Sequence, residues 1–181
     1  MILEILLEIE EGEHSHVAIR NALSKYQFLP KQDRAFITRV CEGTLEYRIQ
    51  IDYIINSFSK VTVDKMKPAI REILRSAVYQ LKYMDSVPDS AVCNEAVKLA
   101  QRKGFYNLKP FVNGVLRTIA REMDQVRFPQ KEDDLLKYLS VKYSMPEVLV
   151  TRWLEAYGEE TTEKILADFL MEHPLTIRCR T

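Results

Sequence analysis

The chain has 181 residues, of which 46% are hydrophobic and 29% charged, a balance typical of one globular domain with or without a smaller appendage. It holds only five glycines and seven prolines, which argues against a turn-rich all-β fold. The 26 basic residues equal the 26 acidic ones, so net charge alone does not make this a nucleic-acid-binding protein.

Apolar residues recur with the helical period along most of the chain, and no stretch alternates as a sheet would require. Gly12, Gly104 and Gly158 are expected to end helices, and Pro68 occupies a first turn, where a proline is tolerated. Residues 60–65 are interpreted as a loop. The helices predicted in chain order span residues 2–11, 15–25, 31–59, 68–84, 89–104, 108–123, 135–143, 146–157 and 159–172.

The organisation predicted from composition has three parts. Residues 1–125 form a helical domain, and residues 126–172 form a linker followed by a short helical extension, because a proline and three consecutive acids follow Val126. Residues 173–181 alternate as the first strand of a further domain. A lone strand leaves backbone groups unpaired, so we expect the chain to be a fragment of a longer protein.

Residues able to carry out chemistry are scarce. The three cysteines and three histidines show no metal-ligand spacing, and no phosphate-binding loop or nucleophile motif is present. We expect no catalytic, cofactor-binding or metal-binding residue in this chain. Without a signal peptide or an apolar run of membrane-spanning length, we expect a cytoplasmic protein with reduced thiols and no membrane contact.

Two glycines lie inside predicted helices, where glycine costs about 1 kcal/mol relative to alanine. Gly43 and Gly114 both border apolar stripes, so we expect each to allow two helices to approach closely. Asn113 is expected to be a partly buried amide that bonds a neighbouring loop.

Charge is distributed unevenly along the chain. Residues 98–121 carry six basic side chains and no acidic one, and such a surplus could contact a phosphate backbone. Taken alone, this pattern is explained more simply as a solvated helix face.

Three segments resemble the NusB fold, in the form found at the N-terminus of bacterial 16S rRNA cytosine-C5 methyltransferases of the Sun family. The resemblance covers residues 2–124. The segments that carry it are KQDRAFITRVCEGTLEYRIQIDYII (31–55), IREILRSAVYQLKYMDSVPDSAVCNEAVKLAQ (70–101) and FVNGVLR (111–117).

Two features favour the methyltransferase form over the free-standing antitermination factor of the same fold. Arg117 completes the VNGVLR motif, and residues 126–181 are similar to the linker helices and first strand that lead into such a catalytic domain. The chain departs from the family where His173, Pro174 and Leu175 replace the usual paired prolines, and Cys179 matches no catalytic position.

The resemblance implies an all-α NusB-like helical bundle followed by a short helical extension. It implies a module that docks 16S rRNA. The S-adenosylmethionine cofactor and both catalytic cysteines would belong to a C-terminal methyltransferase domain, and that domain would be the module's partner within the same protein. A free antitermination factor and a purely structural adaptor remain alternatives. The predicted RNA-binding residues are Arg71, Arg75, Lys98, Arg102, Lys103, Lys109, Arg117 and Arg121.

Within this set, Lys98, Arg102 and Lys103 are the most secure members. Arg75 and Arg117 adjoin core stripes and could instead pair internally with acids such as Glu95.

Overall fold

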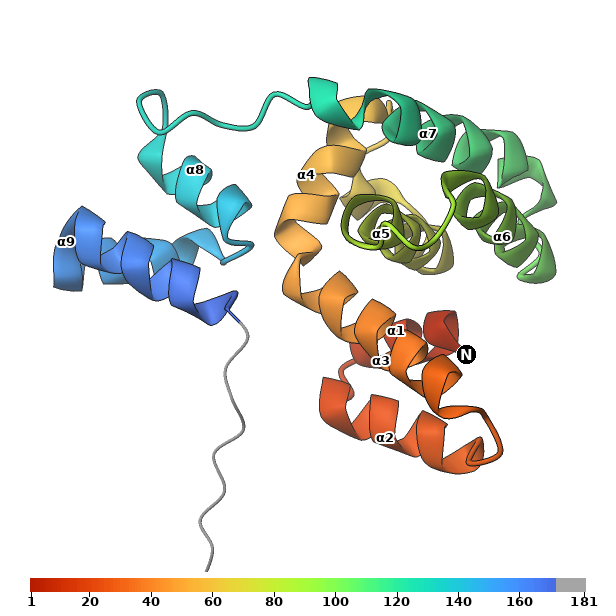
Figure 1. The fold of residues 1–181 in the computed structure, drawn as a ribbon. Coiled ribbons are helices and arrows are strands. Elements are labelled where there is room, and N and C mark those ends of the chain that lie inside the picture. The colour runs from red at the N-terminus through yellow and green to blue at the C-terminus, as the bar shows by residue number, and fades with distance from the viewer. Residues whose placement is uncertain (172–181) are drawn as a thin grey trace, which may run out of the picture. The chain divides into compact units, whose positions relative to one another are not determined.

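The computed structural model describes residues 1–171, which contain nine α-helices, three short 3-10 turns and no strand (Figure 1). The predicted all-α class is therefore confirmed, whereas the strand expected at 173–181 lies outside the described residues. The 3-10 turns are Val63–Lys65, Tyr106–Leu108 and Met123–Gln125. The helices are α1 (Ile2–Glu10), α2 (Ser15–Lys25), α3 (Lys31–Glu46), α4 (Arg48–Phe58), α5 (Pro68–Tyr83), α6 (Asp89–Arg102), α7 (Lys109–Glu122), α8 (Leu135–Lys142) and α9 (Glu147–Phe169).

The chain divides into two compact units, the first spanning Met1–Arg127 and the second beginning at Phe128. In the first unit α5 is the central helix, because it packs against α1, α3, α4, α6 and α7 (Figure 1). Its stripe of Ile70, Ile73, Leu74, Ala77 and Val78 is at most 2% exposed. Burial of this stripe from several sides is what holds the bundle together.

The predicted single helix over residues 31–59 is wrong, because the structure breaks it at Tyr47 into α3 and α4. Tyr47 leaves helical geometry at φ −94° and ψ 17°. Its ring lies 4.3 Å from that of Tyr83 and 6.3 Å from that of Tyr79, centroid to centroid, so packing onto α5 accompanies the break. The bend lets α3 pack against α1 and α2 while α4 packs against α7.

The two mid-helix glycines differ in their surroundings. A Cβ added at Gly43 would lie 2.0 Å from Cζ of Tyr79, so this glycine makes room for the ring of an α5 side chain and not for the α5 backbone. The predicted close approach of two helices is wrong for Gly114, which is exposed and would place a Cβ within 4 Å of nothing. Within residues 1–171 the Asn113 side chain bonds no loop, contrary to the prediction. Its side-chain oxygen accepts a hydrogen bond from Nε of Arg117 on the same helix.

The second unit is built from α8 and α9 around Leu139, Val150 and Leu166, all fully buried. Gly158 interrupts α9 with φ 73° and ψ 174°, which confirms the helix end predicted at this glycine. The rings of Trp153 and Phe169 stack with centroids 5.7 Å apart, whereas sixteen residues of straight helix would separate them by roughly 24 Å. The second half of α9 therefore folds back on the first.

Candidate nucleic-acid interface

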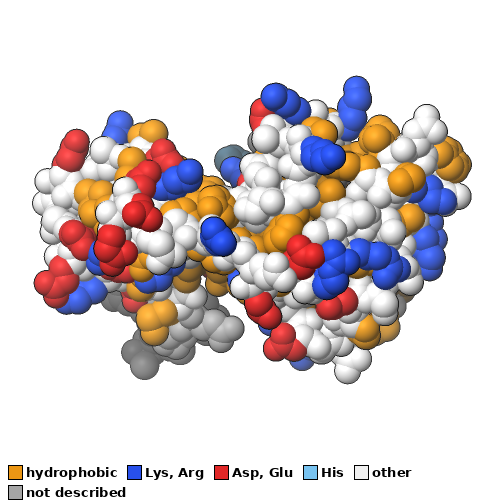
Figure 2. Space-filling model, turned by 90° about the horizontal axis from the view of Figure 1, so that it is seen from above, with side chains coloured by type: hydrophobic (Ala, Val, Ile, Leu, Met, Phe, Trp, Pro, Cys, Tyr) orange, Lys and Arg blue, Asp and Glu red, His pale blue; other side chains and the backbone are white. Residues whose placement is uncertain are grey.

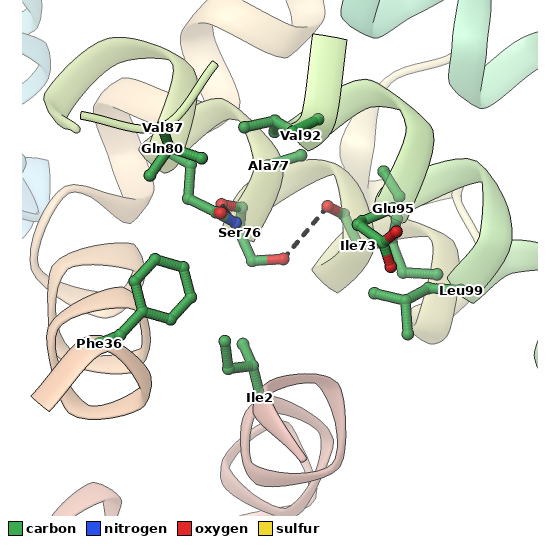
Figure 3. A pocket seen from close by; sticks show the side chains of 12 residues that line it. Ile2, Phe36, Ile73, Ser76, Ala77, Gln80, Val87, Val92, Glu95 and Leu99 are labelled. Carbon is green, nitrogen blue, oxygen red and sulfur yellow. Dashed lines mark hydrogen bonds between the residues drawn. The ribbon is translucent and has the colours of Figure 1, made fainter. Parts of the chain in front are cut away.

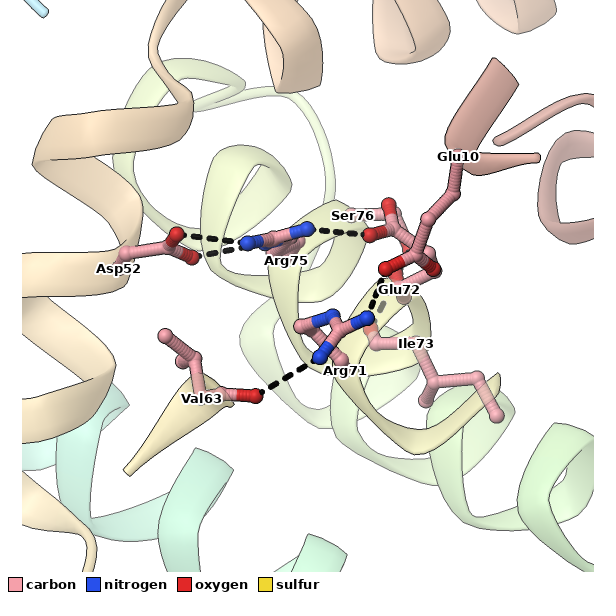
Figure 4. A network of polar contacts seen from close by, with 8 residues as sticks. All are labelled: Glu10, Asp52, Val63, Arg71, Glu72, Ile73, Arg75 and Ser76. Atoms are coloured by element: carbon pink, nitrogen blue, oxygen red, sulfur yellow. Dashed lines mark hydrogen bonds and ion pairs between the residues drawn. The ribbon is translucent and has the colours of Figure 1, made fainter. Parts of the chain in front are cut away.

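Arg75 is directed into the first unit and not onto its surface (Figure 4). Its Nε and Nη2 donate hydrogen bonds of 2.7 and 2.6 Å to the two carboxylate oxygens of Asp52, and Nη1 donates one of 2.5 Å to Glu72. The Arg75 side chain is only 10% exposed and that of Glu72 only 4%. Burial raises the pKa of Glu72 above its usual range although Arg75 opposes the shift. The internal pairing with acids that was the alternative for Arg75 is therefore what the structure shows, and an RNA contact would have to break these pairs with α4 and α5 carboxylates.

Arg71 is also an internal residue (Figure 4). It forms an ion pair with Glu10 of α1, and its Nη1 donates a 3.2 Å hydrogen bond to the carbonyl oxygen of Val63. The Arg71 side chain is 16% exposed. It ties α5 to α1 and to the Val63–Lys65 turn, so an RNA contact at Arg71 would have to break these links as well.

The other six predicted residues lie on α6, on α7 or at their ends. Figure 2 shows Lys and Arg side chains at several places on this face of the protein. Lys98 and Arg102 are exposed one turn apart on α6, and Arg117 and Arg121 are exposed one turn apart on α7. Because α6 and α7 pack against each other, these side chains belong to one helical pair. The six residues, called here the α6–α7 cations, are Lys98, Arg102, Lys103, Lys109, Arg117 and Arg121.

Three of the α6–α7 cations have acidic partners. Nζ of Lys98 lies 2.7 Å from Glu95, Nζ of Lys103 lies 3.0 Å from Glu4, and Nη2 of Arg121 lies 2.6 Å from Glu122. The N-terminal ammonium and then Lys103 lower the pKa of Glu4 to about 2. Such exposed pairs contribute about 0–1 kcal/mol, so they can be exchanged for a phosphate contact.

The remaining three, Arg102, Lys109 and Arg117, have no acidic partner within residues 1–171. Arg117 borders a surface hollow lined by Asp89, Ser90 and other residues of α6 and α7, and its Nε is held 2.9 Å from Asn113. The predicted alternative, that Arg117 pairs with Glu95, is not what the structure shows, because Glu95 is paired with Lys98. None of these three forms an ion pair within residues 1–171, although Lys98 lowers the pKa of Glu95 and the charge of Arg102 adds to this shift.

Sequence reasoning did not single out Tyr106, which is 61% exposed in the turn between α6 and α7. The available signal was an aromatic residue set between Lys103 and Lys109 in the segment RKGFYNLK.

A separate hollow of about 260 Å³ lies between α1, α3, α5 and α6 (Figure 3). Ile2, Phe36 and Leu99 give it an apolar lining, and the Ser76 hydroxyl is already bonded to carbonyl oxygens of α5. A nucleoside cofactor such as S-adenosylmethionine needs partners for its ribose, base and amino-acid groups, and this lining does not fit it.

Within residues 1–171 there is also no cluster of His, Cys, Asp and Glu able to hold a metal ion, and no helix there is long and apolar enough to cross a membrane.

A helical bundle around a buried central helix, with six Lys and Arg side chains on or beside the helix pair α6 and α7, defines the class of protein: an all-α helical domain. The chain belongs to the NusB family, whose model matches residues 1–121.

Relatives of two kinds are similar to this chain. A protein named probable ribosomal RNA small subunit methyltransferase B, from Bacillus subtilis (strain 168), is 35% identical over 97% of this chain and 39% of its own length. The transcription antitermination protein NusB of Dictyoglomus thermophilum is 32% identical over 70% of this chain and 83% of its own length. The chain thus spans about two fifths of the methyltransferase relative.

Solved structures give the same picture of the fold. NusB from T. maritima superposes with a TM-score of 0.60 at 26% identity, over 67% of this chain and 86% of that one. The crystal structure of the protein PH0851 superposes with a TM-score of 0.75 over 95% of this chain and 38% of that one. At 21% identity, the second likeness concerns the fold alone.

Proposed function

We propose that this chain is the RNA-docking part of an S-adenosylmethionine-dependent methyltransferase that modifies carbon 5 of a cytosine in 16S rRNA, in the cytoplasm. The observation that carries the proposal is the extent of the likeness. The methyltransferase relative of B. subtilis aligns with 176 residues, which include α8 and α9, whereas the antitermination protein of D. thermophilum aligns with 127. In this proposal the cofactor and the catalytic groups belong to a further domain of the parent enzyme.

Docking would rest on the α6–α7 cations. Lys and Arg side chains that neutralise phosphates release condensed counterions, so affinity falls steeply as salt rises and depends little on sequence. Arg102, Lys109 and Arg117 can make such contacts without breaking an ion pair to any residue between 1 and 171. Arg71 and Arg75 have no part in this step, because both serve the internal network.

A free-standing antitermination factor is the second candidate. It is favoured by similarity over part of the chain, since the antitermination protein of Acidothermus cellulolyticus is 42% identical over 85 residues. A structural adaptor that touches no RNA is the third.

The test of docking is a titration of a hairpin from small-subunit ribosomal RNA against the chain at about 50 and 200 mM salt. We expect tight binding at low salt, a loss of about tenfold or more at high salt, and much weaker binding by the variant Arg102→Glu/Lys109→Glu/Arg117→Glu. The matched control is Arg20→Glu/Lys25→Glu/Lys31→Glu, which makes the same change in net charge on α2 and at the start of α3. No binding by the unaltered chain at low salt would leave only the adaptor.

The methyltransferase assignment has its own test. The corresponding segment of the B. subtilis relative is replaced by this chain, and 5-methylcytosine is measured in the small-subunit rRNA of a strain that lacks the native protein. We expect methylation to be restored. A folded chimera that binds the hairpin but leaves the rRNA unmethylated would favour the antitermination candidate.

A further inference from the structure

Tyr106 presents an aromatic ring to solvent at the turn that joins α6 to α7. It belongs to the 3-10 turn Tyr106–Leu108 and is 61% exposed, whereas its neighbour Phe105 is half-buried. Within residues 1–171 the ring makes no aromatic contact and its hydroxyl makes no hydrogen bond. No hydrogen bond or aromatic contact within residues 1–171 therefore occupies this side chain.

The backbone holds Tyr106 in a fixed turn. Gly104 ends α6 at φ +84°, a conformation that a residue with a Cβ rarely adopts. The Phe105 N–H donates a 2.9 Å hydrogen bond to the carbonyl oxygen of Ala100, and the Leu108 N–H donates one of 3.0 Å to that of Phe105. A ring on a pre-ordered turn loses little conformational freedom when a ligand covers it.

The surroundings of the ring are cationic. Arg102 and Lys103 precede the turn and Lys109 follows it, and residues 98–121 contain no acidic side chain. The nearest acids that the structure pairs with this region are Glu4, bound to Lys103, and Glu95, bound to Lys98. An apolar protein partner would have to desolvate these charges, because the cores of protein interfaces are depleted of lysine. Aromatic rings beside phosphate-binding cations are the arrangement on which nucleobases stack.

We propose that Tyr106 stacks on an unpaired nucleobase of the RNA whose phosphates contact the α6–α7 cations. The inference rests on the proposed RNA docking and adds the kind of nucleotide that this surface selects. A base inside a duplex is already stacked on both faces, so the ring favours RNA with at least one unpaired nucleotide at this turn.

The test uses the whole chain and a short single-stranded RNA that carries one 2-aminopurine, with a fully paired duplex of the same sequence as the second probe. Binding is followed by anisotropy of an end label, and stacking by quenching of 2-aminopurine fluorescence. We expect Tyr106→Ala to weaken single-strand binding roughly 5- to 150-fold, as loss of one base–aromatic stack does, and to remove the quenching. Tyr106→Phe should keep both, since the ring and not the hydroxyl makes the stack.

The matched control is Tyr157→Ala, which removes a tyrosine that is 57% exposed on α9 and is followed by Glu159 and Glu160 instead of lysines. This variant should bind as the unaltered chain does, and duplex affinity should be the same for Tyr106→Ala as for the unaltered chain. Unchanged single-strand affinity and quenching in Tyr106→Ala would overturn the stacking proposal while leaving RNA docking intact. Failure of the unaltered chain to bind either RNA at low salt would overturn both.

Discussion

The contact between Gly43 on α3 and Tyr79 on α5 gives a sharp test of the packing, through the substitution Gly43→Ala. The added methyl carbon would lie 2.0 Å from Cζ and 2.2 Å from Cε2 of a tyrosine that is 6% exposed. Ordinary van der Waals contact begins near 3.4 Å, so the ring or the helix must move by more than 1 Å. The ring has little room to move, because that of Tyr83 lies 5.3 Å away, centroid to centroid.

The expected magnitude follows from two opposing effects. Overpacking a filled core costs about 1–3 kcal/mol, and a displacement of this size belongs at the upper end. Replacing a mid-helix glycine by alanine returns about 1 kcal/mol of helix propensity. We therefore expect Gly43→Ala to lower the free energy of unfolding by about 2 kcal/mol.

Urea unfolding followed by far-UV circular dichroism measures this change as a lower midpoint at an unchanged slope. Gly114→Ala is the matched control, since Gly114 is a helical glycine of α7 with nothing within 4 Å of the added Cβ. It should raise the free energy of unfolding by up to about 1 kcal/mol. Equal effects of the two substitutions would refute the proposed contact between α3 and α5.

Two further predictions concern the ionic clusters. Arg75→Met should destabilise the first unit by about 3–5 kcal/mol in urea unfolding, because it leaves the Asp52 and Glu72 carboxylates without their partner; a change under 1 kcal/mol would contradict the internal role. In the second unit, Glu163 has a pKa lowered from 4.5 to about 2. The main cause is the hydrogen bond from Lys131, and a hydrogen bond from Lys142 adds to it. A lowered carboxyl pKa stabilises the fold above pH 4.5, and this contribution is lost as the pH falls toward 2. Glu163→Gln should therefore flatten the pH dependence of unfolding in this window, measured by the fluorescence of Trp153, the chain's only tryptophan; an unchanged pH profile would refute the assignment.

Helix positions could be predicted from the sequence because local signals determine them. The apolar period placed the buried stripe of α5, and Gly158 marked the interruption of α9. The break at Tyr47 could not be predicted, since no glycine or proline marks it and the apolar stripe continues from Leu45 to Ile51. Ring packing of Tyr47 against α5 is a tertiary interaction that has no local pattern.

The candidate interface was predicted only in part, for the same reason. Arg71 and Arg75 look like other basic residues in the sequence, because Glu10 and Asp52, which bind them, lie 61 and 23 positions away along the chain. Only Glu72, three positions before Arg75, is a local partner. The acid-free run of residues 98–121 was visible from sequence, and so was Glu95 three positions before Lys98. The ion pair of Lys103 with Glu4 of α1 was not, because the two residues lie far apart along the chain. Tyr106 was missed because charge alone was weighed, and exposure of an aromatic ring becomes known only from the fold.

Phosphate docking by α6 and α7 is tested most directly by the salt dependence of RNA affinity. The slope of log K against log salt concentration is measured for the unaltered chain and for Arg102→Gln/Lys109→Gln/Arg117→Gln, with the same single-stranded 16S rRNA segment. Each phosphate contact on a single strand contributes roughly −0.7 to the slope, so loss of three contacts should make it shallower by about two. Identical slopes for the two proteins would contradict RNA docking through these three side chains.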